Sequence, residues 1–352
     1  MSKFDAKSIE LERETRELDF LIKDLTASID DVQKYTHQRV RARRKSCSRG
    51  GFPPNLADPV QPANGVQRVM EQIGSVEAER FKPLTSCQFC GGGDFSVLQQ
   101  LGGQHRVGRC QGCGTVQLVD RLDEQAVLER YSSQGYFDGE LEVGYQRVSY
   151  QDQQRAKEKT FAHLLRAIGP CLSGRQAMLE VGCGYGYLLK MAQGQFANIY
   201  ATDFSQAAIE SSRPYATQLW QGGLDDVDLA PGSLDLLVAN HVIEHLYDMK
   251  SFLLRVFELL RPGGVVALTT PNFSSPLRWL LRDKWPSWKF PEHVTFFEAK
   301  TLSQAVSAAG FGHVQVGGYR EFFPMQMLHP SLGDRPLWVP TTSLLVTGRK
   351  DS

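Results

Sequence analysis

The chain has 352 residues, of which 41% are hydrophobic and 22% are charged, so it is long enough to bury a full core and has the composition of an ordinary globular protein. Its 39 basic and 39 acidic side chains give a formal net charge of zero, which excludes a global attraction to nucleic acid. No apolar run has the length of a membrane span, and the charged N-terminus lacks the apolar core of a signal peptide. We therefore expect a cytoplasmic location.

A helix is predicted over residues 1–45. Between 11 and 32 the apolar residues recur at spacings of seven, four, three, four and three, which is typical of a short coiled coil and predicts self-association through residues 11–36. An amphipathic helix packed on its own protein is the alternative. The basic run at 39–49 contains no acid, so it is either a solvated helix end or a patch for peripheral contact with anionic lipid. Residues 46–82 are expected to be a linker.

Two cysteine pairs follow. Cys87 and Cys90 form one Cys-x-x-Cys pair, Cys110 and Cys113 form the other, and 19 residues separate them. Four thiolates at this spacing are typical of a structural zinc site, and the glycine after each pair lets amide hydrogens face the sulfurs. A redox dithiol is the alternative, which two matched pairs disfavour. We predict a zinc ribbon over 83–120, followed by a helical connector.

From about residue 153 onward, strand-like and helix-like segments alternate, which predicts a parallel sheet with helices on both faces. Helices are expected to begin near Gly186, Ser205, Met249 and Lys300. The predicted fold class is α/β, a doubly wound seven-stranded sheet over 153–352, preceded by the ribbon, the connector at 121–152 and the N-terminal helix. The strands are expected at 177–182, 198–203, 217–221, 235–240, 264–270, 312–318 and 342–348.

A glycine-rich turn follows the first of these strands. The apolar run carrying Glu180 leads into Gly182, Gly184 and Gly186, and a helical stretch comes next. Glycine there brings backbone amides close to a ligand, and the third glycine comes one residue earlier than in the dinucleotide fingerprint G-x-G-x-x-G. Asp203 ends the next strand, 21 residues after Gly182, where an acid can bind both hydroxyls of a ribose. Capping the following helix is its alternative role.

The fourth predicted strand opens into residues 240–245, Asn-His-Val-Ile-Glu-His. Taken alone, His241-x-x-Glu244-His245 matches the inverted zinc-protease motif. Its place at the carboxyl end of a strand, rather than inside a long helix, argues against a protease. Capping and packing of the next helix is the simplest alternative role for Glu244 and His245.

The acid and three glycines resemble motif I of the class I S-adenosylmethionine-dependent methyltransferases. Together with LLRPGG at 259–264 and PEHVTFF at 291–297, they are similar to the family that includes ubiquinone-biosynthesis-like and sugar-modifying enzymes, over about residues 155–320. The resemblance implies S-adenosylmethionine as the cofactor, with Phe204 packing on the adenine and Asp225 facing its amine. The implied cofactor-binding residues are Glu180, Gly182, Gly184, Gly186, Asp203, Phe204, Leu224, Asp225, Asn240 and His241.

The resemblance also implies a divalent metal near Glu244 and His245, as in ubiquinone-type O-methyltransferases. Methyl transfer to a hydroxyl needs one well-placed base, and an unperturbed His has a suitable pKa of about 6.5. His293 is the first candidate base and His241 the second. His293 lies among Trp and Phe residues after the fifth strand, and these aromatics either wall an acceptor pocket or belong to the core. A structural role is the alternative for His293.

We expect O-methylation of a hydroxyl on a sugar, a glycan or another small metabolite. C-methylation of a deoxysugar is one alternative, because a zinc ribbon also precedes the methyltransferase domain in those enzymes, although the chain after Phe311 is short for their C-terminal domain. Methylation of ribosomal RNA is another, but the chain lacks a basic face and the Asn/Asp-Pro-Pro-aromatic tetrad, so nucleic acid is not the expected partner. The third alternative is a scaffold subunit that has the methyltransferase fold but no catalytic activity.

Overall fold

The computed structural model describes residues 81–101, 105–132, 141–143, 146–148, 153–282, 285, 287–325 and 333–351. The predicted helix at 1–45, its coiled coil, the basic run at 39–49 and the linker up to residue 80 lie outside these residues. The ribbon and the central sheet belong to one compact unit. In the described part of the chain, every helix is too short or too polar to cross a membrane.

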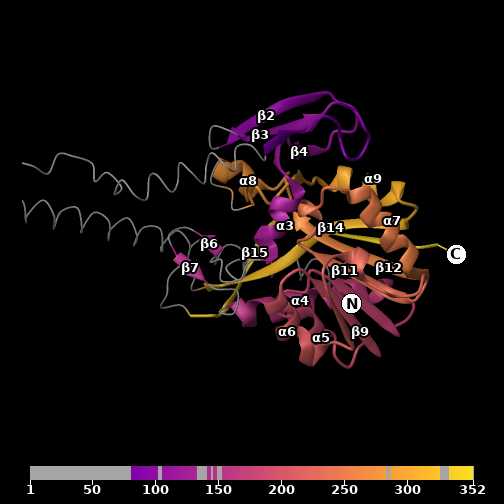
Figure 1. The fold of residues 1–352 in the computed structure, drawn as a ribbon. Coiled ribbons are helices and arrows are strands. Elements are labelled where there is room, and N and C mark those ends of the chain that lie inside the picture. Colours follow the sequence, from indigo (N-terminus) through magenta and orange to yellow (C-terminus); the bar gives the residue numbers. More distant parts are fainter. Residues whose placement is uncertain are drawn as a thin grey trace, which may run out of the picture. The chain divides into compact units, whose positions relative to one another are not determined.

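A seven-stranded sheet forms the centre of the larger part, in the order β10-β9-β8-β11-β12-β15-β14 (Figure 1). The first five strands in this order run parallel, and β15 is antiparallel to both β12 and β14. All seven predicted strands are present, and β14 extends six residues beyond its predicted end. The strands are β8 (Ala177–Val181), β9 (Asn198–Asp203), β10 (Gln218–Gln221), β11 (Leu234–Asn240), β12 (Leu260–Pro271), β14 (Gly312–Pro324) and β15 (Pro336–Arg349).

Helices cover both faces of this sheet, as the doubly wound prediction requires (Figure 1). Successive side chains of a strand point to opposite faces. Met178, Leu236 and Val238 therefore pack with α4 and α5, whereas Leu179 and Leu237 pack with α7 and α9. The helices are α4 (Gln154–Ile168), α5 (Tyr187–Ala192), α6 (Gln206–Ser212), α7 (Met249–Leu259), α8 (Pro276–Leu281) and α9 (Ala299–Ala308), and four of them begin within one residue of the predicted starts.

The ribbon is a small antiparallel sheet ahead of the central sheet in the chain. Its strands β2 (Phe95–Leu101), β3 (His105–Cys110) and β4 (Val116–Leu118) are extended by β13 (Thr295–Phe296), which follows β12 and α8 in the chain. A second pair joins β1 (Phe81–Pro83) to β5 (Asp120–Leu122). The predicted helical connector contains α3 (Glu124–Ser132) and also a hairpin, β6 (Leu141–Val143) with β7 (Gln146–Val148).

The aromatic cluster around His293 belongs to a small core that the ribbon shares with the segment after β12. Trp285 and Phe296 are 3% exposed and pack with Val116 and Leu118 of the ribbon. This packing supports the core alternative for Trp285 and Phe296, and the acceptor-pocket alternative stays a prediction. Their burial joins the ribbon firmly to the segment that carries His293.

Candidate active site

The three glycines form a tight turn between β8 and α5. Gly182, Gly184 and Gly186 have φ angles of 73°, 51° and 73°, in the left-handed region that favours glycine. A Cβ on Gly182 would lie 2.7 Å from Cγ2 of Val242, and one on Gly186 would lie 2.8 Å from Oγ of Ser212. Backbone conformation and close packing therefore both require glycine at the ends of this turn.

Asp203 lies against the glycine turn, at the carboxyl end of β9. Its Oδ2 accepts a hydrogen bond from the Gly184 amide at 2.9 Å, and its Oδ1 accepts one from the Ser205 amide at 2.9 Å. Ser205, not Asp203, caps α6 through its own side chain. Burial raises the pKa of Asp203, and the two amide hydrogens offset part of this effect. The alternative role of Asp203 as the helix cap is thus taken by its neighbour.

Glu180 lies inside the sheet below this turn and is 1% exposed. Its Oε2 has no hydrogen-bond partner among the described residues. Burial, together with the charge of Asp203, raises the pKa of Glu180 well above its usual range. A buried carboxyl oxygen without a partner is costly, which suggests that a ligand, rather than the fold, satisfies it.

The turn after β10 lies beside Phe204. A Cβ on Gly223 would be 3.3 Å from Cζ of Phe204, whose side chain is 37% exposed. Leu224 is buried, and Oδ2 of Asp226 accepts a hydrogen bond from the Gly223 amide at 2.8 Å, which closes the turn. Asp225 is exposed. Its predicted contact with an adenine amine stays a prediction, as does the stacking of Phe204.

His241 follows β11 and lies between two buried carboxylates. Its Nδ1 is 3.0 Å from Oε1 of Glu244, and its Nε2 is 2.9 Å from Oε1 of Glu321 on β14. Its φ of 54° is uncommon for a residue other than glycine and directs the ring into this position. Burial lowers the pKa of His241, but Glu321 and Glu244 raise it to about 9. The ring is therefore protonated at neutral pH and stabilises both carboxylates.

His293 and His245 lie on the other side of Glu244. The rings of the two His residues meet edge to face with centroids 4.6 Å apart, and Nδ1 of His293 is 2.9 Å from the Ser287 carbonyl oxygen. This contact assigns the proton to Nδ1 and leaves Nε2 as the acceptor. Burial lowers the pKa of His293 well below its usual range, so the ring is neutral at neutral pH.

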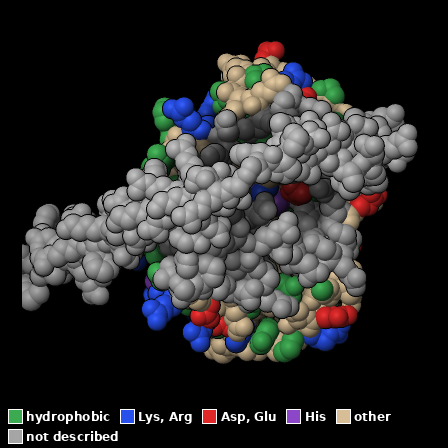
Figure 2. Space-filling view, turned by 90° about the vertical axis from the view of Figure 1, so that its left-hand side faces the viewer, with side chains coloured by type: hydrophobic (Ala, Val, Ile, Leu, Met, Phe, Trp, Pro, Cys, Tyr) green, Lys and Arg blue, Asp and Glu red, His purple; other side chains and the backbone are tan. Residues whose placement is uncertain are grey.

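Glu244, His245 and His293 each offer one ligand atom, and these atoms lie within 4.8 Å of one another. Oε2 of Glu244 is buried and has no hydrogen-bond partner among the described residues. A carboxylate and two neutral imidazoles are typical ligands of a divalent transition metal. Figure 2 shows a hollowed face of the molecule in which acidic, basic and His side chains are visible.

Two residues of β14 belong to this site although the sequence did not indicate them. Glu321 bonds to His241, and the Tyr319 hydroxyl is 3.1 Å from Oδ1 of Asn240. They are two residues apart on one strand, a spacing that places both on one face. The strand predicted at 312–318 ends before either residue, so the alternation along β14 could not indicate that they share a face.

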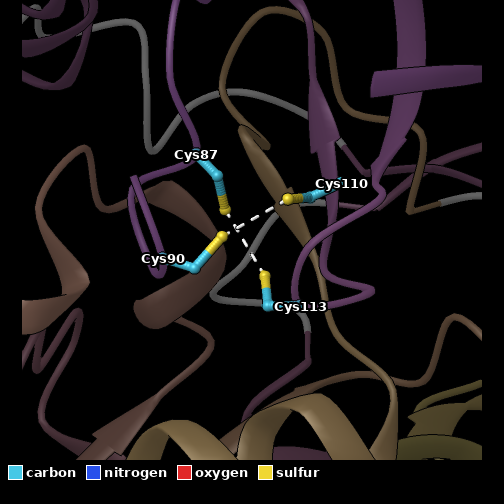
Figure 3. A group of neighbouring side chains, drawn as sticks. All are labelled: Cys87, Cys90, Cys110 and Cys113. Carbon is cyan, nitrogen blue, oxygen red and sulfur yellow. Dashed lines mark hydrogen bonds between the residues drawn. The ribbon is translucent and has the colours of Figure 1, made fainter. Parts of the chain in front are cut away.

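The four cysteines converge on one point (Figure 3). The Sγ atoms of Cys87 and Cys113 are 3.5 Å apart, as are those of Cys90 and Cys110. Sulfurs about 2.3 Å from a tetrahedral zinc ion lie about 3.8 Å from one another, so this donor set fits zinc. All four positions of such an ion would be filled by thiolates, as expected of a structural site.

Comparisons with known proteins agree with this geometry. A family model described as a methyltransferase domain matches residues 150–316. A protein of Mycolicibacterium smegmatis named as a probable S-adenosylmethionine-dependent methyltransferase is 31% identical over 38% of this chain and 51% of its own. A trans-aconitate 2-methyltransferase of Methylobacterium radiotolerans is 33% identical over 32% and 44%, and a ubiquinone biosynthesis O-methyltransferase of Bradyrhizobium is 28% identical over 36% and 56%.

The chain spans about half the length of these curated relatives. The segment matched by the family model contains the glycine turn. The strand order of the central sheet is the one in which a doubly wound sheet binds its ligand at the carboxyl ends of the strands. Residues 150–316 are therefore a class I S-adenosylmethionine-dependent methyltransferase domain, and a four-cysteine cluster lies ahead of it in the chain.

Proposed function

We propose that this protein methylates a hydroxyl group of a sugar, a glycan or another small metabolite, with S-adenosylmethionine as the methyl donor. The observation that carries the proposal is the juxtaposition of the glycine turn with the cluster of Glu244, His245 and His293. Val242, two residues before Glu244, lies against Gly182. A cofactor held by the glycine turn and an acceptor near the cluster would therefore be neighbours.

The residues for holding the cofactor are those of the turn and the strand ends around it. When bound, S-adenosylmethionine supplies a methyl group that is already activated by its sulfonium. The chain has to orient the acceptor and remove its proton. We assign Asp203 to the ribose hydroxyls, and its hydrogen bond with the Gly184 amide supports this because it holds the carboxylate beside the glycine turn. We assign Glu180 to cofactor binding, and its buried Oε2, which has no partner among the described residues, supports this. Phe204, Leu224 and Asp225 are proposed to surround the adenine.

His293 is the proposed base. Because its Nδ1 donates to the Ser287 carbonyl, the remaining nitrogen is a proton acceptor. Burial lowers the pKa and keeps the ring neutral at neutral pH, but it also makes His293 a weaker base than the unperturbed His expected from the sequence. We do not assign His241 to this role. Glu321 and Glu244 raise the pKa of its ring to about 9, and a protonated ring cannot take a second proton. We assign His241 to the orientation of Glu244.

A divalent metal on Glu244, His245 and His293 is a second candidate for activating the acceptor. The unpaired Oε2 of Glu244 favours it, because a metal would satisfy that oxygen. A bound divalent ion lowers the pKa of a coordinated hydroxyl, and His293 would then be a ligand instead of the base.

The relatives and the charge of the chain support a small acceptor. One relative is named for trans-aconitate and another for O-methylation in ubiquinone biosynthesis. The zero net charge does not favour RNA. The boundaries of the ribbon at 83–120 and of the methyltransferase domain at 153–352 are part of this proposal, as is self-association through 11–36.

Calorimetry with S-adenosylmethionine tests the cofactor assignment. We expect wild-type protein to bind it, and Asp203→Ala to bind at least about tenfold more weakly because hydrogen bonds to a charged acceptor are lost. Asp228→Asn, which replaces an exposed carboxylate outside the predicted cofactor-binding residues, serves as the matched control and should bind normally. Absence of heat with the wild-type protein would refute the proposal.

Labelled cofactor incubated with a small-molecule extract identifies the acceptor by mass spectrometry. With that acceptor, His293→Ala should lose turnover and keep its affinity for the cofactor. His245→Ala, which removes one proposed metal ligand and leaves the four cysteines intact, separates the two mechanisms. If His293 is a free base, this variant keeps its turnover, whereas a metal mechanism requires that turnover is lost.

A further inference from the structure

Gln117 connects the cysteine cluster to the interior of the protein. It is fully buried on β4. Its Nε2 donates a hydrogen bond to Sγ of Cys87 at 2.9 Å, and its Oε1 accepts one from the Arg121 guanidinium at 2.8 Å. One amide side chain therefore contacts a zinc-ligating sulfur and a buried cation at the same time.

Arg121 is 6% exposed and has an unusual set of partners. Besides Gln117, it donates to the Leu118 carbonyl at 3.1 Å and to the Val294 carbonyl at 3.5 Å, and it lies 5.7 Å from the centroid of the Tyr247 ring. In the part of the chain that the structure describes, no carboxylate forms a salt bridge with it. Burial lowers the pKa of Arg121 to about 10.

A buried cation is costly unless an opposite charge lies nearby. Four thiolates around one zinc ion carry a net charge of about −2, and Gln117 is the only side chain between Cys87 and Arg121 along this hydrogen-bonded path. The metal-loaded cysteine cluster is therefore a counter-charge for Arg121. Loss of the metal would leave Cys87 without the ion that fixes its sulfur, and the hydrogen bond from Gln117 would then lose its fixed acceptor.

Val294 is the end of the path in the methyltransferase domain. Its carbonyl accepts from Arg121 and from the Leu118 amide, the latter at 3.0 Å, and its own amide donates to the Glu244 carbonyl at 2.8 Å. His293 precedes it directly in the chain. The backbone that carries His293 is thus held between the ribbon on one side and the Glu244 turn on the other.

We propose that Gln117 and Arg121 are positioning residues that transmit the metal state of the ribbon to the segment of His293, so that zinc binding fixes that segment against Glu244. The ribbon is then part of the active-site scaffold rather than a separate binding module. An effect of zinc on catalysis rests on the proposed function. The coupling between zinc binding and the order of the His293 segment does not.

Amide hydrogen exchange on the full-length protein tests the coupling without an acceptor. The chain is measured with zinc and after removal of zinc by a chelator, as wild type, Arg121→Met and Arg109→Gln, and zinc content is determined for each sample. Arg109→Gln is the matched control, because Arg109 also joins the ribbon to the later segment, through Glu298, but has no bond to a cysteine.

In the wild-type protein, removal of zinc should increase exchange of the amides at 292–297 about tenfold, with β8 and β11 unchanged. Zinc-loaded Arg121→Met should already show this increase, and removal of zinc should add less than about twofold. Arg109→Gln should respond to zinc removal as the wild type does. Arg121→Lys, which keeps the cation, should recover part of the protection.

An equal response to zinc removal in wild type and Arg121→Met would overturn the proposal, as would unchanged exchange at 292–297 in the wild type. If Arg121→Met does not fold, Gln117→Leu interrupts the same path. Its exchange at 292–297, with and without zinc, should then match the results expected for Arg121→Met. Failure to bind S-adenosylmethionine would refute the proposed function and leave the exchange result intact, so the two can be distinguished.

Discussion

Replacement of Asp235 by Asn should destabilise the protein strongly. Asp235 is the second residue of β11 and is 3% exposed. Its Oδ2 accepts from the amides of Gln176 and Ala177 at 2.7 and 2.9 Å, and its Oδ1 accepts from the guanidinium of Arg261 at 2.7 Å. The carboxylate therefore joins the start of β8 to β12 across β11.

The donors around Asp235 determine how much unfolding free energy the substitution should remove. Both carboxylate oxygens of Asp235 face N–H groups. In either orientation, an Asn side chain would therefore direct its NH₂ group at another donor. Breaking one side of a fully buried ion pair costs about 3–5 kcal/mol. The Arg261 side chain is 33% exposed, so the loss should be nearer the value for hydrogen bonds to a charged group, about 1.5–3 kcal/mol. We expect the free energy of unfolding of Asp235→Asn, from urea denaturation at pH 7, to fall by that amount with an unchanged slope. The exposed Asp228→Asn should change it by less than about 0.5 kcal/mol.

The stability difference between wild type and Asp235→Asn should depend on pH, and the direction follows from the pKa of Asp235. Burial alone raises the pKa of Asp235, but the Ala177 amide and Arg261 bring it below the ordinary value. A carboxyl with a depressed folded-state pKa contributes stability above its unfolded pKa of about 3.9 and loses it as the pH falls through the folded pKa. The gap between wild type and Asp235→Asn should therefore narrow below about pH 4. A gap under about 1 kcal/mol at pH 7, or one that does not narrow in acid, would refute the reasoning.

Gly186→Ala should lower the melting temperature, because the new side chain would combine a left-handed φ with a Cβ 2.8 Å from Ser212 Oγ. The expected loss of stability is about 1–2 kcal/mol, and an unchanged melting curve would contradict it. Cys110→Ser should lower bound zinc, measured by atomic absorption, while Cys171→Ser, outside the cluster, should retain one ion per chain. Glu180→Gln should not destabilise the cofactor-free protein at pH 7. The raised pKa of Glu180 means that its ionised form opposes folding above about pH 4.3, so any gain in stability should vanish in acid.

Local patterns were sufficient to predict several parts of the site. The glycine spacing indicated a tight turn that brings backbone amides close to a ligand. Gly182, Gly184 and Gly186 form this turn with left-handed φ angles. The two Cys-x-x-Cys pairs converge because each pair occupies one tight turn and antiparallel strands return the second turn to the first. Asp203 lies beside the glycine turn because neighbouring parallel strands end at the same edge of a sheet.

The sequence by itself determined the fold class, the glycine turn and the cysteine cluster, because these depend on spacings within a strand, a turn or a hairpin. Only the tertiary structure decided that His241 is protonated, since its partner Glu321 lies 80 residues away on a strand whose extension was not visible in the hydrophobic pattern. The link from Cys87 to Val294 through Gln117 and Arg121 is likewise tertiary. It arises because β13 pairs with β4 of the ribbon, a register that no local spacing encodes.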